Sequence, residues 1–316
     1  MQRKERCLVL GGGGFIGSHL TEELLNAGYD VTVFDKLNFS RKNITGFLEK
    51  INIAEGDFNN QIEIDNALEG SDYVFHLVSS TLPASSNENP VYDVETNLIS
   101  SLNLFKECVE RKIKKVIFLS SGGTVYGVPE SIPVKENNST NPICSYGIVK
   151  KAIEDYLFMF RKIYGLDYFV FRLSNPYGER QNPFAAQGVI PVFMNNAIED
   201  KQISIWGDGE VVRDYIYIKD AVEILVKSLK VNSENKVFNL SSGTGFSLNQ
   251  IIDFIKVVSG KEIRVEYQKG RSIDVPVSIL DNTKVKETFE WLPETEIMDG
   301  MKRTYKYLIN LKDLNV

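Results

Sequence analysis

The chain has 316 residues, of which 43% are hydrophobic and 25% charged, as in an ordinary globular protein. Its formal net charge of −6 argues against a nucleic-acid partner, because neutralising phosphate backbones needs an excess of basic residues. No apolar run approaches the roughly 18 residues of a membrane span. The three cysteines and two histidines lack the spacing of a metal site, and an odd cysteine count favours the reducing cytoplasm.

The N-terminal half alternates predicted strands with predicted helices. A short apolar strand over 7–10 ends in glycines, and the helical period of the next apolar residues ends at Gly28. A second strand follows at 31–34, and later strands are predicted at 72–77 and 115–119, with a helix over 97–111 between them. Strands separated by helices imply a doubly wound parallel sheet covered on both faces, hence an α/β fold.

The C-terminal half contains more loop and shorter elements. Helices are predicted over 189–199, 221–229 and 248–258, and no linker or internal repeat separates the two halves. We therefore expect a nucleotide-binding domain over 1–174 and a smaller α/β domain over 175–316. The segment 211–240 is expected to pack back on the first domain.

A glycine-rich turn connects the first predicted strand to the first predicted helix. Residues 11–17 read Gly-Gly-Gly-Gly-Phe-Ile-Gly and fit two templates, one starting at Gly12 and one at Gly11, that share Gly14 and Gly17. Such turns need positive φ and a backbone without Cβ atoms, so that a pyrophosphate can approach. The helix-terminal amides at Phe15 and Ile16 then meet the phosphate charge. This pattern predicts a bound dinucleotide.

An acid at the end of the second strand indicates which dinucleotide is bound. Asp35 is suited to a ribose 2′-hydroxyl. Three basic residues follow closely, which leaves a 2′-phosphate open, but the carboxylate would repel that phosphate, so we favour NAD. Asp57 and Phe58 follow the next strand and are predicted to cover the adenine; an ordinary turn is the alternative.

Tyr146 and Lys150 form a Tyr-x-x-x-Lys pair on a predicted helix. The i, i+4 spacing places both side chains on one helix face. A phenol has a pKa of about 10. A neighbouring ammonium and the positive charge of a nicotinamide can lower it toward neutrality. The tyrosinate can then act as a general base for a sugar hydroxyl.

These motifs resemble the extended short-chain dehydrogenase/reductase family, in particular its NAD-dependent nucleotide-sugar epimerases and dehydratases, over about residues 7–305. The resemblance implies a Rossmann-type domain. The segment 120–127, Ser-Ser-Gly-Gly-Thr-Val-Tyr-Gly, is similar to the family segment that supplies a third catalytic hydroxyl. That hydroxyl comes from Ser121 or Thr124, and Ser121 is favoured. Asn97 matches an asparagine in a helix that contacts the cofactor.

The resemblance also assigns the substrate contacts to the C-terminal half. Asn175 lies in a segment similar to the family's Arg-x-x-Asn-x-Tyr-Gly, whose asparagine contacts the substrate diphosphate. Arg213 and Arg271 match arginines that can hold a diphosphate through bidentate hydrogen bonds. Asp274 could bind a ribose hydroxyl or cap a loop. Ser278 matches a position that lines C2 of the sugar.

The residues before Val125 narrow the reaction within this family. Family 4,6-dehydratases carry an Asp-Glu pair where this chain has Gly123 and Thr124. Without these carboxylates elimination lacks its acid and base, which favours a 4-epimerase that removes hydride from C4 and returns it to the other face. A nucleotide-sugar 4-reductase, an unusual dehydratase and a non-catalytic NAD-binding regulatory protein remain open. UDP is the nucleotide that the resemblance favours.

The resemblance further implies a homodimer through a four-helix bundle. Its helices correspond to 97–111 and 146–164. Their apolar residues suit either intersubunit packing or packing on the chain's own sheet. They are Ile99, Leu102, Phe105, Ile153, Leu157 and Phe160.

Overall fold

The computed structural model describes residues 3–185, 187–270 and 275–313. The chain forms two compact units, and the main boundary lies between Leu173 and Ser174. The first unit comprises Met1–Val128, Ser139–Leu173 and Val222–Phe238. The second comprises Pro129–Asn138, Ser174–Ala221 and Asn239–Val316. Of the segment 211–240, residues 222–238 therefore belong to the first unit.

The first unit contains a seven-stranded sheet, and its order confirms the predicted doubly wound parallel fold. The order is β10-β6-β5-β4-β1-β2-β3. The first strand therefore lies inside the sheet, β2 and β3 are added on one side of it, and β4, β5 and β6 on the other. Each pair from β3 to β6 is parallel. The strands are β1 (Arg6–Leu10), β2 (Asp30–Asp35), β3 (Asn52–Glu55), β4 (Tyr73–His76), β5 (Lys115–Ser121), β6 (Tyr168–Leu173) and β10 (Val237–Leu240).

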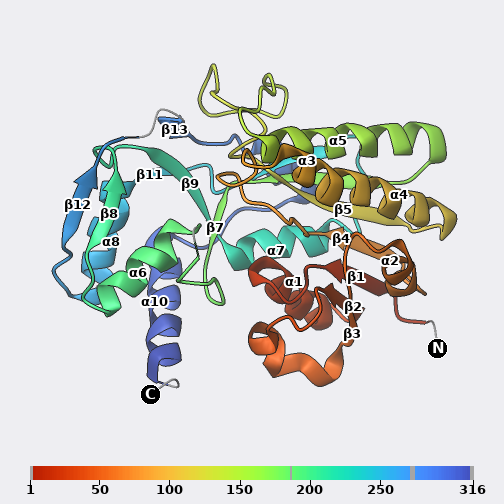
Figure 1. Ribbon diagram of the computed structural model, residues 1–316, viewed down its shortest axis with the longest axis horizontal. Helices are drawn as coiled ribbons and strands as arrows, with labels where there is room; N and C mark the ends of the chain where they lie inside the picture. Colours follow the sequence, from red (N-terminus) through yellow and green to blue (C-terminus); the bar gives the residue numbers. More distant parts are fainter. Residues whose placement is uncertain (1–2, 186, 271–274, 314–316) are drawn as a thin grey trace. The chain divides into compact units, whose positions relative to one another are not determined.

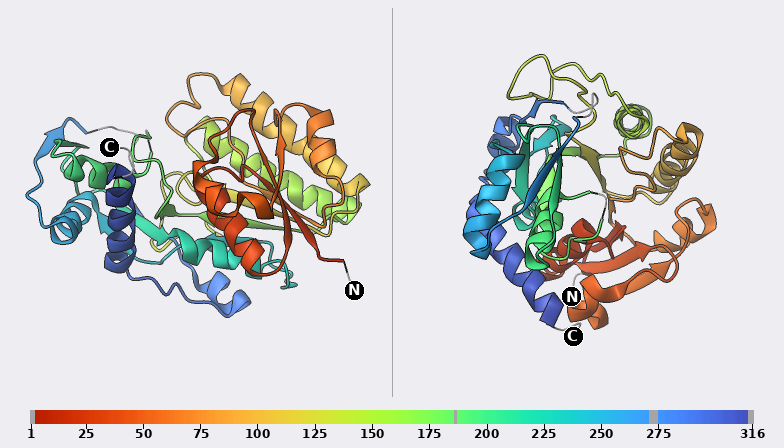
Figure 2. Two further views of the ribbon diagram at one scale, coloured as in Figure 1. Left: turned by 90° about the horizontal axis from the view of Figure 1, so that it is seen from below. Right: turned by 60° about the vertical axis from the view of Figure 1, so that its left-hand side comes forward.

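Helices cover both faces of this sheet. Figures 1 and 2 show α4 and α5 side by side on one face and α1 on the other. Right-handed crossovers place helices on both faces, because β2 and β3 follow on one side of β1 whereas β4, β5 and β6 follow on the other. The core between α4, α5 and the sheet is built from buried aliphatic and aromatic side chains. The helical segments are α1 (Phe15–Asn26), η1 (Arg41–Lys50), α2 (Gln61–Ala67), α3 (Pro90–Asp93), η2 (Val94–Ile99), α4 (Ser100–Glu110) and α5 (Ser145–Tyr164).

The second unit has smaller sheets and its own helical layer. Strand β9 pairs with three others, β7 and β13 in parallel and β11 antiparallel, while β8 pairs with β12. Helices α6, α8 and α10 pack against one another. The strands are β7 (Asn175–Tyr177), β8 (Ile203–Trp206), β9 (Val212–Tyr217), β11 (Gly245–Ser247), β12 (Val265–Gln268) and β13 (Val277–Ser278). The helices are α6 (Val189–Ile198), α7 (Ile218–Lys227), which continues into the first unit, α8 (Leu248–Ser259), α9 (Thr283–Phe289) and α10 (Ile297–Asp313).

Candidate active site

The glycine turn after β1 follows the template that starts at Gly11. Gly11 has a φ of 82°, and its amide donates to the carbonyl oxygen of Phe34 at 2.8 Å. A Cβ at Gly17 would overlap the Gly11 carbonyl oxygen, so the first turn of α1 can approach the turn only without a side chain. Gly12 and Gly13 are also constrained, since Cβ atoms there would collide with the side chains of Val33 and Phe39.

The N-terminus of α1 is open to an anion. Gly14 is its N-cap and provides no side-chain hydrogen bond to the free amides of the first turn. Asp35 ends β2 beside this turn, and its carboxylate accepts hydrogen bonds from the amides of Gly13 and Lys36, both at 2.9 Å. A turn without Cβ atoms, an uncapped helix N-terminus and an adjacent acid together fit a dinucleotide of the NAD type.

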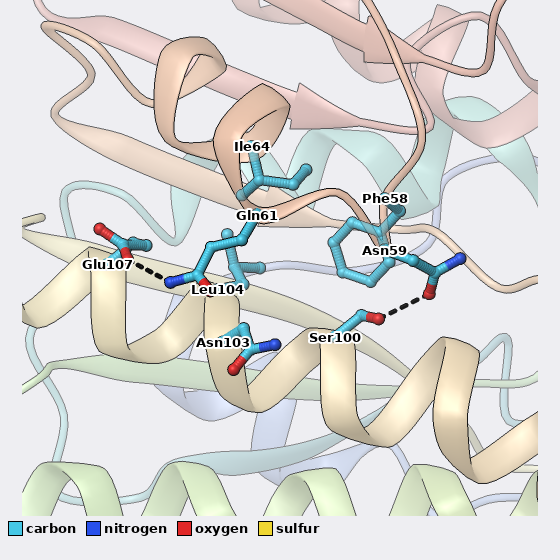
Figure 3. Close-up of a pocket in the computed structure, with 8 residues that line it drawn as sticks. All are labelled: Phe58, Asn59, Gln61, Ile64, Ser100, Asn103, Leu104 and Glu107. Carbon is cyan, nitrogen blue, oxygen red and sulfur yellow. Dashed lines mark hydrogen bonds between the residues drawn. The ribbon is translucent and has the colours of Figure 1, made fainter.

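The predicted adenine residues differ in exposure. Asp57 is exposed and accepts hydrogen bonds from the amide and side chain of Asn59. The Phe58 ring is buried in the core, with its centroid 5.1 Å from that of His76, so its side chain serves packing. Figure 3 shows Phe58 in the wall of a small pocket beside α4, where Ser100 donates to Asn59. This cavity of about 10 Å³ would hold one water molecule and no nucleotide.

The Tyr146–Lys150 pair lies in the first turns of α5. The ammonium nitrogen of Lys150 lies 5.6 Å from the centre of the Tyr146 ring and donates to the carbonyl oxygen of Leu119 at 3.0 Å. Lys150 is 5% exposed, so its charge is held in a largely dry environment. The structure thus brings the two side chains together on one helix face.

Burial shifts the pKa values of Tyr146 and Lys150 in opposite directions. It raises the pKa of Tyr146 to about 12, with smaller contributions in the same direction from Cys144 and Asp93. It lowers the pKa of Lys150 to about 8, which Asp93 and Glu154 partly counteract. The neighbouring lysine therefore does not by itself bring the pKa of the Tyr146 phenol below its ordinary value.

The two candidate hydroxyls lie at the end of β5 and on the turn that follows it. Ser121 is the last residue of β5, and its carbonyl oxygen accepts a hydrogen bond from the amide of Thr124 at 3.4 Å. The side-chain oxygen of Thr124 is buried and has no hydrogen-bond partner in the part of the chain that the structure describes. Buried hydroxyls are rarely left unpaired, so Thr124 is at least as good a candidate as Ser121 for a ligand contact.

The side chain of Asn97 forms hydrogen bonds to other residues of the first unit. It donates to the hydroxyl of Ser80 and the carboxylate of Asp93, both at 2.8 Å, and accepts from the amide of Ser80 at 2.9 Å. Asp93 also accepts from the hydroxyl of Ser145, the residue before Tyr146. We did not predict Asp93 or Ser145 from the sequence. The signal available was the i, i+4 spacing of Asp93 and Asn97.

A buried ion pair connects α5 with β6. Arg172 of β6 contacts Glu154 of α5 through two nitrogens, the shorter distance being 2.7 Å, and both side chains are at most 5% exposed. Ser120 donates to the same carboxylate, and Arg172 donates to the hydroxyl of Tyr126. Glu154 was also not predicted, although it is one helical turn beyond Lys150.

In the second unit, the register of three strands aligns the candidate substrate residues. Ser278 of β13 lies opposite Arg213 of β9, and Asn175 of β7 lies opposite Tyr215, two residues further along β9. Paired residues project to the same face of a sheet, as do residues two apart in a strand, so all three belong to one face. Arg271 and Asp274 lie outside the described residues.

These side chains contact nearby backbone. Arg213 donates to the carbonyl oxygens of Val212 and Val275, at 2.9 and 2.6 Å. Asn175 donates to the carbonyl oxygen of Asp214 at 2.9 Å. No group of His, Cys, Asp and Glu suited to a metal occurs among the described residues. No helix within them is long and apolar enough to cross a membrane.

Comparison with known proteins places the chain in a family. The profile of the NAD dependent epimerase/dehydratase family matches residues 7–241. A UDP-glucose 4-epimerase of Mycolicibacterium smegmatis is 30% identical over 315 residues, which cover 96% of this chain and 99% of that protein.

Two solved structures share the fold over nearly their whole length. A UDP-glucose 4-epimerase with UDP-glucose, from Thermotoga maritima, has a TM-score of 0.91 and 36% identity, covering 97% of this chain and 99% of the other. A UDP-N-acetylglucosamine 4-epimerase from Methanobrevibacter ruminantium, in complex with UDP-N-acetylmuramic acid, has a TM-score of 0.92 and 31% identity, covering 98% and 100%. The chain belongs to the NAD-dependent epimerase/dehydratase family, as the glycine turn and the Tyr146–Lys150 pair predict.

Proposed function

We propose that the chain is an NAD-dependent 4-epimerase of a UDP-linked hexose or N-acetylhexosamine. The observation that carries this proposal is the pairing of Tyr146 with the buried Lys150, which follows a turn bearing an unpaired Thr124 hydroxyl and no carboxylate. Together with a bound NAD, which would accept and return the hydride, this set of groups suffices to oxidise and reduce one sugar carbon. It lacks the acid and base that an elimination would need at positions 123 and 124.

The proposed reaction moves one proton and one hydride in each direction. Tyr146, as phenolate, takes the proton of the C4 hydroxyl, and Lys150 stabilises that phenolate through its positive charge. Bound NAD would supply the acceptor for the hydride from C4 and, after the 4-keto sugar turns over, the donor of that hydride to the opposite face. Tyr146 then returns the proton to the oxygen. Thr124 or Ser121 donates a hydrogen bond to that oxygen throughout.

The other candidate residues have supporting roles in this proposal. Gly11, Gly14 and Gly17 would admit the pyrophosphate to the amides of α1, and Asp35 would bind the adenosine ribose. In the second unit, Asn175 and Arg213 would bind the substrate diphosphate, since guanidinium and amide groups donate to phosphate oxygens.

The test is to incubate the purified protein separately with UDP-glucose, UDP-galactose and their N-acetyl forms, and to identify the products by NMR. We expect interconversion of C4 epimers without net consumption of NAD(H), because the hydride returns to the sugar. Tyr146→Phe is the matched inactive control. Stoichiometric consumption of NADH with one reduced product would instead identify a 4-reductase, and a 4-keto-6-deoxy product would identify a dehydratase.

Cofactor retention provides a second measurement. Because NAD is regenerated in every cycle, it can stay bound, so protein purified without added cofactor should release NAD(H) on denaturation. Tight binding of NADP without measurable binding of NAD would overturn the role proposed for Asp35.

The free state of all three cysteines supports a reducing compartment such as the cytoplasm.

The proposal includes a homodimer through α4 and α5. Of the residues that suit such an interface, Phe105, Ile153, Leu157 and Phe160 are at most 4% exposed and pack within their own unit. Ile99 is 47% exposed. Further exposed apolar side chains on α5 support the interface. They are Ile148, Tyr156, Phe158 and Ile163.

Sedimentation at micromolar concentration tests the dimer. Phe158 is 54% exposed on α5, and we expect Phe158→Glu to shift the equilibrium toward monomer, because a charge would be buried at the interface. Phe184→Glu, at a site 75% exposed in the second unit, is the control and should leave the mass unchanged. A monomeric native protein would contradict the proposal.

A further inference from the structure

Two buried carboxylates act on Lys150, and one of them already has a cationic partner. Glu154, one turn beyond Lys150 on α5, lies 2.7 Å from a guanidinium nitrogen of Arg172 and accepts a second hydrogen bond from it at 3.1 Å. Ser120 donates to the same carboxylate. The negative charge of Glu154 is therefore largely balanced by Arg172.

The other carboxylate, Asp93, has only neutral hydrogen-bond partners. Its side chain is completely buried at the end of α3. It accepts from the hydroxyls of Thr81 at 2.6 Å and Ser145 at 2.7 Å, and from the amide nitrogen of Asn97 at 2.8 Å. No salt bridge formed by the described residues includes Asp93. A buried carboxylate without a counter-charge destabilises the folded state, so a cation is expected nearby.

Of the two buried cations in this region, Arg172 is paired with Glu154, so Lys150 is the candidate partner of Asp93. Its ammonium lies 4.7 Å from the centre of the Phe118 ring and 5.6 Å from that of the Tyr146 ring, and donates to the carbonyl oxygen of Leu119. The charged or titratable groups that act on it electrostatically are the two carboxylates and the buried His76. Since Arg172 pairs with Glu154, a protonated Lys150 makes the four buried charges sum to zero. The attraction between Lys150 and Asp93 acts across more than salt-bridge distance, but water and salt screen it little in a buried site.

We propose that Asp93 is the buried counter-charge of Lys150 and a positioning residue of the active site. Its carboxylate keeps Lys150 in the ammonium form. Through its hydrogen bond to Ser145 it also holds the first turn of α5, which carries Tyr146. The catalytic consequence rests on the proposed function, whereas the charge pairing does not depend on which substrate the enzyme takes.

The electrostatics of the site agree with this geometry. Burial lowers the pKa of Lys150 to about 8, and Asp93 is the largest of the charges that raise it, ahead of Glu154. Asp93 also contributes to the raised pKa of Tyr146, after burial and Cys144. Removing this negative charge should therefore lower the pKa of both groups.

A direct test follows the titration of the Lys150 side chain by NMR in the cofactor-bound protein, with the resonance assigned by its loss in Lys150→Met. In Asp93→Asn we expect the midpoint to fall by about one pH unit or more. Ser145→Ala is the matched control, because it removes a hydrogen bond to Asp93 but keeps the charge, so the Lys150 midpoint should stay in place. An unchanged midpoint in Asp93→Asn would overturn the proposal.

Thermal unfolding provides a second test that does not need Asp93→Asn to fold by itself. Lys150→Met leaves Asp93 buried without a counter-charge and should lower Tm. Adding Asp93→Asn to Lys150→Met removes that unpaired charge, so the double variant should unfold at a higher temperature than Lys150→Met alone. A double variant with an equal or lower Tm would contradict the pairing.

The pH profile of turnover connects the pairing to catalysis. Activity requires Tyr146 deprotonated, which sets the acid limb, and Lys150 protonated, which sets the alkaline limb. Because both pKa values fall in Asp93→Asn, both limbs should move to lower pH, whereas a merely structural defect would lower the rate and leave the limbs in place. A shifted Lys150 titration in a protein without epimerase activity would refute the proposed function and leave the pairing intact.

Discussion

The two units prepare their candidate site residues in different ways. In the first unit, side chains from separate elements bind one another in buried networks, such as Asp93 with Asn97 and Ser145. In the second unit, Asn175 binds a backbone carbonyl of the neighbouring strand β9, and Arg213 binds the carbonyl of Val275, just before β13. The first arrangement fixes charge and protonation. The second fixes position through strand register.

This difference has consequences for mutation. A change within a buried network alters the electrostatics of every member, because no water is available to replace a lost charge or hydrogen bond. A change on a strand face alters the shape of that face and leaves the backbone ladder in place. We therefore expect large effects on chemistry and stability in the first unit, and smaller effects on selectivity in the second.

The largest effect is expected at Tyr146. Tyr146→Phe removes the hydroxyl that exchanges the proton and should reduce kcat by about 10²- to 10⁴-fold. Substrate affinity, measured by calorimetry with the UDP sugar, should change little, because the ring and helix α5 remain. Full activity in this variant would refute the mechanism and, with it, the claim that the first unit provides the chemistry.

The contribution of the buried network to stability can be measured by substituting Glu154. Glu154→Gln leaves the Arg172 guanidinium buried beside a neutral amide and should lower the free energy of unfolding by about 3–5 kcal/mol. Its neighbour Asp155 is the matched control, since its i, i+4 ion pair with Lys151 is on the surface. Asp155→Asn should cost less than about 1 kcal/mol. If urea unfolding shows equal losses of unfolding free energy in both variants, the buried ion pair contributes no more to stability than the surface pair.

The requirement for a residue without a Cβ atom in the glycine turn can be tested at Gly17. Gly17→Ala places a Cβ against the carbonyl oxygen of Gly11 and should destabilise the protein by about 1–3 kcal/mol and weaken NAD retention. Gly46→Ala is the control, because a Cβ at Gly46 meets no atom within 4 Å. It should keep both stability and bound NAD. An unaffected Gly17→Ala would mean that α1 can shift away from the turn.

The sequence predicts best where one short segment must satisfy one local geometry. The turn at 11–17 and the Tyr146–Lys150 pair each depend on neighbours within a few residues, so both can be predicted from the sequence. The surroundings of Phe58 and Asp93 cannot be predicted in this way, because their burial and hydrogen bonding depend on elements far away in the chain. Helix α10 (Ile297–Asp313) was not predicted, although residues such as Met301, Thr304 and Leu308 are buried at helical spacing.

The same reason limits prediction in the second unit. Ser278 and Arg213 are far apart in sequence and become neighbours only through the pairing of β13 with β9. Family resemblance could identify both residues, but only the strand register shows that they project from one face together with Asn175.

The smallest expected effect concerns the size of the sugar at Ser278. A serine is small, so if its side chain lines C2 of the sugar, an N-acetyl group fits, and the enzyme should accept the UDP-N-acetylhexosamines at least as well as the unacetylated sugars. Ser278→Tyr would overfill that space and should lower kcat/KM for the acetylated substrates by about tenfold, equivalent to about 1.4 kcal/mol, while sparing UDP-glucose. Ser278→Ala is the control, and its selectivity should stay nearly unchanged because steric room matters more than one hydroxyl. Steady-state kinetics on both substrate pairs decides the matter: equal losses on acetylated and unacetylated sugars would show that β13 positions the nucleotide and does not select the sugar.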